Sequence, residues 1–464
     1  MASSTKTRGF HFSAVLTTQG WQQNVSAELD DSGFFTALTS DDNPHNLPYI
    51  DGYALPGSPN LHSHAFQRAM AGLGELRGNP GDSFWSWREV MYKFVATIDP
   101  DDLKAIATRL YVDFLKGGFT SVGEFHYLHH NPDGTPYDDP AQMSVAIIEA
   151  ARVSGIALTH LPVFYAHSGF GGTAPNQGQK RFVHSLGDYA KLLQSLNDHC
   201  HSPLHKIGIA PHSLRAVTAD ELSKLEGFRH DLVASAPMHI HIAEQTKEVD
   251  DCVAHCGARP VEWLLDAAPV DDTWCLIHAT HMNPDEIRNL AKTGAIAGLC
   301  PMTEANLGDG IFPAEEFVAA GGRFGIGTDS NIRTNVAEEL QMLEYSQRLS
   351  KRRRNILADN DNPNVGNNLY LQACRGGAKA LAQPVGAIEV GSRADFIVLD
   401  AHMDGVPRPA NPRFTDYWLF GAVDRTPKDV YVAGQQVIAN GCHEYEEAID
   451  RDYRRVMQNL LAEI

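Results

Sequence analysis

Side chains that could bind a metal ion or transfer protons occur in four groups along the sequence, and each group follows a short apolar run. In order, they are His62 and His64, His241 with Glu244, His278, and Asp329. Three imidazoles and a carboxylate suit a hydrolytic metal ion that keeps one position open for water. The spare acid and the spare histidine can then move protons. The pattern therefore predicts a metal centre held by His62, His64, His241 and Asp329.

The spacing of the histidines supports this ligand set. His62 and His64 are two residues apart, so on a strand both imidazoles point to the same face. A lone His-x-His pair is a weak signal, and it gains weight from the groups downstream. His239 and His241 also share a face, but His241 lies nearer the end of its run and three residues before Glu244. We therefore expect His241 to be the ligand and His239 to be packed or hydrogen-bonded nearby.

The remaining polar residues have competing interpretations. Glu244 is expected to shuttle protons beside the metal, although a surface glutamate at a helix start fits the same position. His278 suits a ligand, a base or a core histidine; with four ligands already assigned, an orienting and proton-accepting role is favoured. Asp329 is expected to bind the metal and to hydrogen-bond the attacking water, with the N-cap of the next helix as its alternative.

Eight apolar runs must position these groups. They cover residues 55–64, 121–125, 156–164, 207–211, 237–244, 273–278, 295–300 and 324–328. Stretches with helical spacing separate them, for example 101–116, 140–154 and 337–349. Alternating strands and helices predict a (β/α)8 barrel, with a doubly wound sheet as the alternative. The candidate site residues end runs one, five, six and eight, and only a closed barrel makes the first and eighth strands neighbours.

The two ends of the chain have a different pattern. Residues 10–53 show short alternating segments that predict small antiparallel strands, and residues 386–400 and 429–434 predict further strands. Residues 444–464 predict a helix. We therefore expect a discontinuous small β domain made from residues 1–55 and 381–464, the latter including the terminal helix, around a hydrolase barrel of residues 56–380.

Composition excludes several classes of protein. The 464 residues carry a net charge of −19, which disfavours nucleic-acid binding. Neither a signal peptide nor a membrane-spanning window is evident. Seven scattered cysteines lack the paired spacing of a zinc ribbon and fit reduced thiols, so a cytoplasmic location is expected.

Together, the order His-x-His, His-x-x-Glu, His and Asp resembles the amidohydrolase superfamily, and specifically its mononuclear deaminase branch. This resemblance implies a distorted TIM (β/α)8 barrel with a small β-sandwich built from both termini. Binuclear members carry a bridging lysine at the fourth strand, where residues 206–212 read KIGIAPH and offer no obvious counterpart. One divalent metal per chain is expected. Iron(II), manganese and zinc all suit the ligands, and Zn²⁺ is favoured.

Within that branch, residues 55–72, 123–127, 210–217 and 302–310 resemble the iminohydrolases that release ammonia from N-formimino-L-glutamate during histidine breakdown. The resemblance implies N-formyl-L-glutamate as the other product, and a homodimer. It also implies a set of substrate-binding residues: Gln67, Arg88, Tyr127, His212 and Arg215. Such a substrate has two carboxylates, and each arginine offers one of them a planar fork.

Three other functions remain open at this level. A related deaminase would act on a cyclic amidine, such as a guanine-like or adenosine-like ring. A non-catalytic metal-binding barrel is a second possibility, although Glu244 and His278 are both present. Cleavage of the other C–N bond would give formamide and glutamate, and only the resemblance argues against it.

Overall fold

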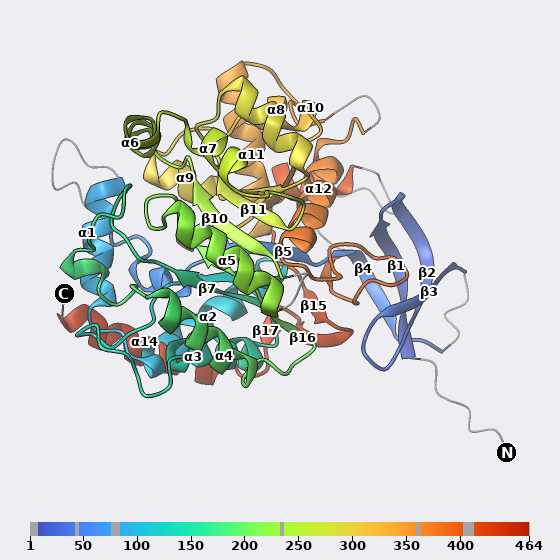
Figure 1. The fold of residues 1–464 in the computed structure, drawn as a ribbon. Coiled ribbons are helices and arrows are strands. Elements are labelled where there is room, and N and C mark those ends of the chain that lie inside the picture. The colour runs from blue at the N-terminus through green and yellow to red at the C-terminus, as the bar shows by residue number, and fades with distance from the viewer. Residues whose placement is uncertain are drawn as a thin grey trace.

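The computed structural model describes residues 8–41, 46–75, 84–232, 236–358, 362–401 and 413–463. Figure 1 shows a barrel of strands and helices, with the first strands of the chain projecting from one side. Among the described helices, none combines the length and apolar character needed to cross a bilayer.

Parallel strands form two arcs of the barrel. The first arc contains β5 (Ser58–Ser63), β6 (Phe119–His126), β7 (Ala157–Phe164) and β8 (His205–Ile207), with β9 (Ala210–Pro211) also paired to β7. The second contains β10 (Met238–Ile242), β11 (Trp274–His278), β12 (Ile296–Leu299) and β13 (Arg323–Ile326). Each of the eight predicted apolar runs contributes to this set.

Isolated bridges join the arcs at both seams. Ser63 pairs with Asp329 at one seam, and Ile209 with Met238 at the other. Single bridges in place of full ladders make the barrel irregular, with β8 and β9 sharing its fourth position. The fold is the predicted distorted TIM barrel, in which the first and eighth strands are neighbours.

Helices cover the outside of the barrel. They are α1 (Phe84–Val95), α2 (Pro100–Lys116), α3 (Gln142–Ser154), α4 (Leu186–Asn197), α5 (Ala219–Leu232), α6 (Thr246–Cys256), α7 (Pro260–Ala267), α8 (Pro284–Thr293), α9 (Pro301–Leu307), α10 (Ala314–Ala319), α11 (Val336–Lys351) and α12 (Val365–Ala380). Local sequence sets several ends. The Asp99 side chain caps α2 before Pro100, and α8 ends at Gly294 with a φ of 78°.

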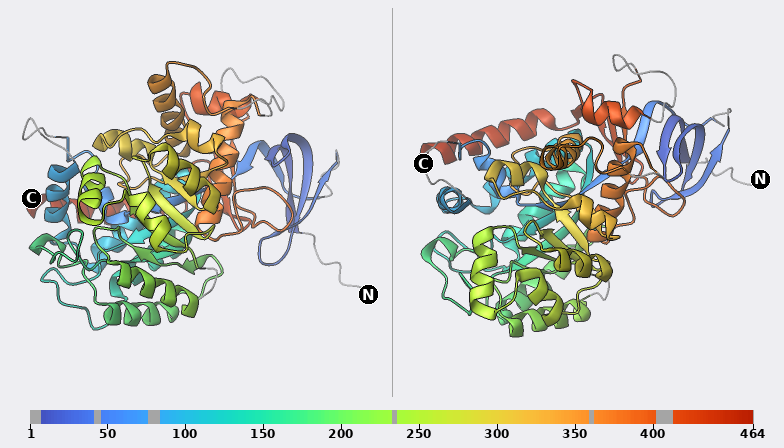
Figure 2. Two further views of the ribbon diagram at one scale, coloured as in Figure 1. Left: turned by 45° about the horizontal axis from the view of Figure 1, so that its top comes forward. Right: turned by 90° about the horizontal axis from the view of Figure 1, so that it is seen from above.

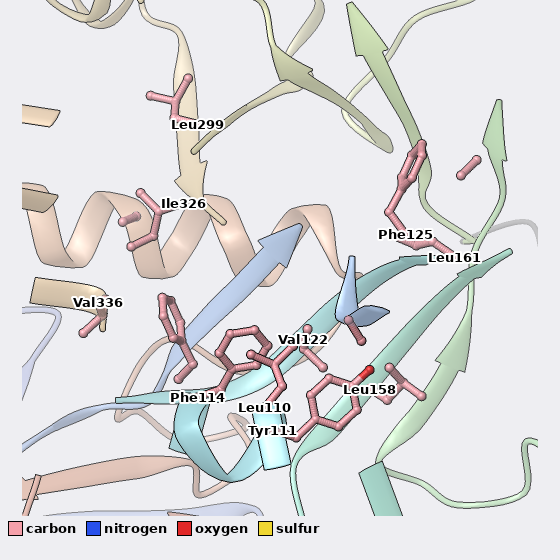
Figure 3. Packing of buried hydrophobic residues seen from close by; sticks show 14 of the residues in the cluster. Leu110, Tyr111, Phe114, Val122, Phe125, Leu158, Leu161, Leu299, Ile326 and Val336 are labelled. Atoms are coloured by element: carbon pink, nitrogen blue, oxygen red, sulfur yellow. The ribbon is translucent and has the colours of Figure 1, made fainter. Parts of the chain in front are cut away.

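Apolar packing fixes the helices on the strands. Leu110 and Phe114 of α2 are fully buried near Val122 of β6 and Leu158 of β7 (Figure 3). Burying such a side chain contributes about 1.5–3 kcal/mol. Inside the barrel, Leu61 belongs to a smaller apolar cluster that includes residues from α12 and β11.

The small domain is built from both ends of the chain, as predicted. Its strands are β1 (Arg8–Thr17), β2 (Gly20–Leu29), β3 (Phe35–Ser40), β4 (Tyr49–Pro56), β14 (Phe396–Leu399), β15 (Asp429–Val432), β16 (Gln435–Ala439) and β17 (Cys442–His443). They follow one hydrogen-bonded path in the order β17-β16-β15-β14-β4-β1-β2-β3. The ring of Phe10 lies 5.2 Å from those of both Phe396 and Tyr431, so separate parts of the path close over one core.

Three details differ from the sequence predictions. The N-terminal strands are not all antiparallel, because β1 pairs with β4 in parallel. The predicted run 55–64 is divided: Leu55 and Pro56 pair with β14, and the barrel strand begins at Ser58. At the junction, a Cβ on Gly57 would lie 2.2 Å from the Thr120 hydroxyl, so a larger residue does not fit.

The terminal helix α14 (Glu446–Glu463) packs on the barrel. Arg109 of α2 contacts Asp450 at 2.6 Å, and Lys116 contacts Glu446 at the same distance. Figure 2 shows α14 along the outside of the barrel, although in sequence it follows the last strands of the small domain.

Candidate active site

The four predicted metal ligands lie together at one end of the barrel. Their donor atoms are all within 4.8 Å of one another, and the residues are buried. Asp329 Oδ1 lies 3.1 Å from His64 Nε2 and 3.4 Å from His62 Nε2. The Nε2 atoms of His62 and His241 are 3.0 Å apart. Residues almost 270 positions apart in sequence thus converge on one point.

The seam between β5 and β13 sets this geometry. The backbone N–H groups of Thr328 and Asp329 both donate to the His62 carbonyl, and the His64 N–H donates to the Asp329 carbonyl. Asp329 has a φ of 46°, which is uncommon for a residue other than glycine. Such a backbone persists only where the surroundings hold it, and here three hydrogen bonds do so.

Hydrogen bonds to backbone carbonyls orient two of the imidazoles. His64 Nδ1 lies 2.8 Å from the Phe125 carbonyl, and His241 Nδ1 lies 3.0 Å from the His212 carbonyl. A protonated Nδ1 in each ring leaves the Nε2 lone pair directed at the cluster. Burial lowers the pKa of His62 to about 3, which keeps that imidazole neutral. The donor set therefore fits a divalent metal ion.

A second grouping of donors is less suitable. His278, Cys300 and Asp329 also have donor atoms within 4.8 Å of one another. Burial raises the pKa of the Cys300 thiol well above its ordinary value, so the thiol remains protonated. The three histidines with Asp329 supply four donors, against three in this grouping, and are therefore the better ligand set.

The predicted proton carriers face the same cluster. His278 Nε2 lies 3.9 Å from Glu244 Oε1 and 3.9 Å from Asp329 Oδ2. Burial raises the pKa of the Glu244 carboxyl, partly opposed by His278. Burial alone would lower the pKa of His278, but the charges of Glu244, Glu304 and Asp329 outweigh it and raise that pKa to about 10. The three carboxylates therefore favour the protonated imidazole of His278, and burial favours the protonated carboxyl of Glu244.

Glu304 is a site residue that the sequence analysis did not assign. Its Oε1 lies 3.3 Å from His278 Nδ1 and also accepts from the Cys300 N–H at 3.0 Å. Glu304 lies in α9, where a glutamate has no local feature that separates it from a surface residue. Its only signal was its place in the segment 302–310.

A pocket open to solvent lies over the metal-ligand cluster. All five predicted substrate-binding residues line it: Gln67, Arg88, Tyr127, His212 and Arg215. The structure therefore brings the two predicted groups of residues to one cavity. The wall also contains residues that the sequence analysis missed: Trp87, Met91, Tyr92, Tyr165, Phe182 and Leu307. Aromatic side chains in helices and loops carry no spacing signal, so only the fold could identify them.

Polar contacts and charged side chains characterise the wall of this pocket. Arg215 follows β9 and is buried; burial would lower its pKa, but the nearby carboxylates of Glu248 and Glu244 raise it. Arg88 comes from α1, and its guanidinium carbon lies 5.6 Å from the centre of the Tyr92 ring. Gln67 Nε2 donates to the Tyr127 hydroxyl at 2.8 Å. Two guanidinium groups thus give a pocket in an acidic protein a local positive charge.

Known proteins resemble this chain in sequence. The Amidohydrolase family model matches residues 53–437. Formimidoylglutamate deiminase of Pseudomonas aeruginosa is 49% identical over 447 residues, which cover 96% of this chain and 98% of that protein. The 8-oxoguanine deaminase of the same organism is 27% identical over 349 residues, covering 74% of this chain and 73% of that protein.

Two solved structures also align with this chain. An amidohydrolase from Brucella melitensis aligns with a TM-score of 0.92 and 46% identity, covering 98% of this chain and 100% of that one. A zinc-bound adenosine deaminase from Xanthomonas campestris aligns at 0.80 with 19% identity, over 98% and 99% of the two chains, and supports the fold. The predicted resemblance is confirmed, and the chain belongs to the amidohydrolase family.

Proposed function

We propose that this protein hydrolyses N-formimino-L-glutamate to N-formyl-L-glutamate and ammonia. The observation that carries the proposal is the presence of Arg88 and Arg215 in the pocket that contains the metal-ligand cluster. A substrate with two carboxylates and one hydrolysable amidine matches two cations and one hydrolytic centre. The 49% identical relative named formimidoylglutamate deiminase supports the same substrate.

Substrate binding follows from the charges of the wall. Each guanidinium can bind a carboxylate through two parallel hydrogen bonds, which fixes both position and orientation. Desolvation lowers the pKa of His212 well below its ordinary value, so its neutral imidazole offers a hydrogen bond without a further charge. With its carboxylates at the arginines, the substrate directs its formimino group toward Glu244 and Asp329.

His62, His64, His241 and Asp329 would hold the metal, and we propose one Zn²⁺ per chain. The chemistry that such an ion would supply is a lowered pKa of water, and so a nucleophile near neutral pH. Asp329 Oδ2 is placed to accept a proton from the water, and His278 Nε2, 3.9 Å away, is placed to orient the water, because the raised pKa of His278 favours its protonated form. Fixing these groups before reaction avoids reorganisation during it.

Glu244 supplies the proton that the substrate needs. Water adds to the formimino carbon while the raised pKa of Glu244 keeps a proton available for the imine nitrogen. The second proton of water then reaches the same nitrogen, the C–N bond breaks, and ammonia leaves. The first proton of water, accepted by Asp329, returns to Glu244 and restores both groups. The carbon retains the oxygen of water as a formyl group, so atoms and charge balance.

Substrates that lack one carboxylate test this proposal. The kcat/KM for N-formimino-L-glutamate is compared with that for N-formimino-4-aminobutyrate, which has no α-carboxylate, in the native protein and in Arg88→Met and Arg215→Met variants. We expect one variant to lose its selectivity between the two substrates while the other retains it. Equal selectivity in all three proteins would contradict the assignment of the arginines.

The aromatic wall favours one competing function. Trp87, Tyr92 and Tyr165 offer faces on which a cyclic amidine could stack, and the pocket lies in a family that includes an 8-oxoguanine deaminase. Assays with guanine, 8-oxoguanine and adenosine test this second candidate. Turnover of a ring substrate faster than N-formimino-L-glutamate would replace the first proposal.

Location and assembly belong to the same proposal. We propose a cytoplasmic enzyme of histidine breakdown that binds neither nucleic acid nor membrane; the seven free cysteines and the net charge of −19 support this. The homodimer rests on the family resemblance. Light scattering tests it, because a dimer has twice the chain mass of 50.9 kDa.

A further inference from the structure

The loop that carries Glu244 is held in a strained shape. Ala243, between β10 and Glu244, has a φ of 51°. The N–H groups of Ala243 and Glu244 each donate to the Glu248 carboxylate at 3.2 Å. A side chain that must meet a reacting nitrogen needs such support, because the loop would otherwise relax.

A second set of contacts supports this loop from α9. Gln245, next to Glu244, donates its side-chain N–H to Asp309 Oδ1. The Asp309 carbonyl accepts from His281 Nε2 at 2.9 Å, and the His281 N–H donates to the Ala243 carbonyl at 3.0 Å. Asp309 therefore contacts the Glu244 loop directly through Gln245 and indirectly through His281.

Asp309 is itself fixed and buried. It follows the C-terminus of α9, its N–H donates to the Glu304 carbonyl at 3.0 Å, and it is 5% exposed. Its Oδ2 is also buried and has no hydrogen-bond partner in the described part of the chain. Buried carboxyl oxygens are seldom left unpaired, so a role outside folding would explain this one.

We propose that Asp309 is a positioning residue that holds Glu244 in place through Gln245. The inference rests on the proposed function, in which Glu244 is the proton donor. One short element then supports both proton carriers, because Glu304 of α9 contacts His278 and Asp309 at the end of α9 contacts Gln245. Burial is the main cause that raises the pKa of Asp309 to about 8, and a neutral Asp309 carboxyl can accept from Gln245 without adding a charge beside the loop.

A double-mutant cycle tests this role. We expect Asp309→Ala and Gln245→Ala each to lower kcat about tenfold, because small displacements of catalytic groups are costly. KM should stay within about twofold of the native value, as the arginines are untouched. The double variant should lose no more than the worse single variant, because both remove the same contact. Asp309→Asn keeps an acceptor oxygen and should restore most of kcat.

Matched measurements separate positioning from folding. Gln341→Ala is the control. Gln341 Oε1 accepts a hydrogen bond from Arg425 at 3.0 Å outside the pocket, so its removal should leave kcat unchanged. Metal content should remain that of the native protein in every variant. A lower melting temperature with native kcat in Asp309→Ala, or losses that multiply in the double variant, would overturn the inference. If Asp309→Ala fails to fold, the Gln245→Ala and Asp309→Asn variants decide. Absence of ammonia release by the native protein would instead overturn the proposed function.

Discussion

The floor and the wall of the pocket are built differently. The floor consists of groups at strand ends, such as His62 and Asp329, which are buried and held by backbone hydrogen bonds across strands. The wall draws on α1, which supplies the partly buried Trp87 and Arg88, and on loops, which supply buried residues such as Arg215. The comparison teaches that strand register brings the candidate catalytic groups of this chain together, whereas loops and α1 supply the residues proposed to bind the substrate.

The largest expected effect separates two histidines of one strand. His241→Ala should abolish metal binding and activity, because His241 faces the cluster. His239→Ala should retain the metal, because His239 Nε2 instead contacts the Ala380 carbonyl at 2.8 Å. The His239→Ala substitution should instead lower the free energy of unfolding by about 1–3 kcal/mol, because a buried hydrogen bond is lost. Metal analysis measures the metal content of each variant, and chemical denaturation measures its stability. Equal loss of metal from the two variants would contradict the different roles of His241 and His239.

Substitution of the proposed proton donor should affect catalysis and leave metal binding and substrate binding nearly unchanged. Glu244→Gln should lower kcat by about 10²–10⁴-fold, the usual contribution of a general acid, with metal content and KM nearly unchanged. Glu221→Gln is a matched control, because Glu221 contacts His167 at 3.0 Å and does not line the pocket. Steady-state kinetics measure the result. Native turnover in Glu244→Gln would assign the proton transfer to another residue.

A substitution in the wall should change affinity more than chemistry. Arg215→Met should lower kcat/KM by about 10–150-fold, which corresponds to a charged hydrogen bond of about 1.5–3 kcal/mol. Metal content should not change, because Arg215 lies outside the ligand cluster. Loss of metal from this variant would show that wall and floor are not independent.

A smaller effect concerns the pH dependence of stability that arises from His160, a buried histidine outside the metal-ligand cluster. Burial lowers the pKa of His160 in β7 to about 3, well below its ordinary 6.5. The unfolded chain therefore binds a proton that the folded chain does not, and stability is lost as pH falls from about 6.5 toward 3. Between pH 6.5 and 5 this single group should cost about 2 kcal/mol. Denaturation of His160→Leu should show a weaker pH dependence; an unchanged slope would contradict this origin.

The convergence of the four candidate metal ligands could be predicted from the sequence because strand periodicity and barrel topology are simple rules. His62 and His64 share a face by their spacing, and Asp329 meets them because the first and eighth strands are neighbours. The division of the first run at Gly57 could not be predicted, because one continuous apolar segment serves two sheets.

Supporting residues were harder to predict. Glu304 and Asp309 lie in and after α9, where no period connects them to His278 or Glu244. Their roles depend on contacts made in three dimensions. The two arginines proposed to bind the substrate were assigned by family resemblance, since single arginines in a sequence do not differ from surface ones.

The central claim is the identity of the reaction, and product analysis tests it most directly. Metal-loaded protein is incubated with N-formimino-L-glutamate in water enriched in oxygen-18, and ammonia and the organic product are measured by mass. The account predicts one ammonia per substrate and N-formyl-L-glutamate that carries one labelled oxygen. Formamide with glutamate, or no turnover by protein that carries its metal, would contradict it.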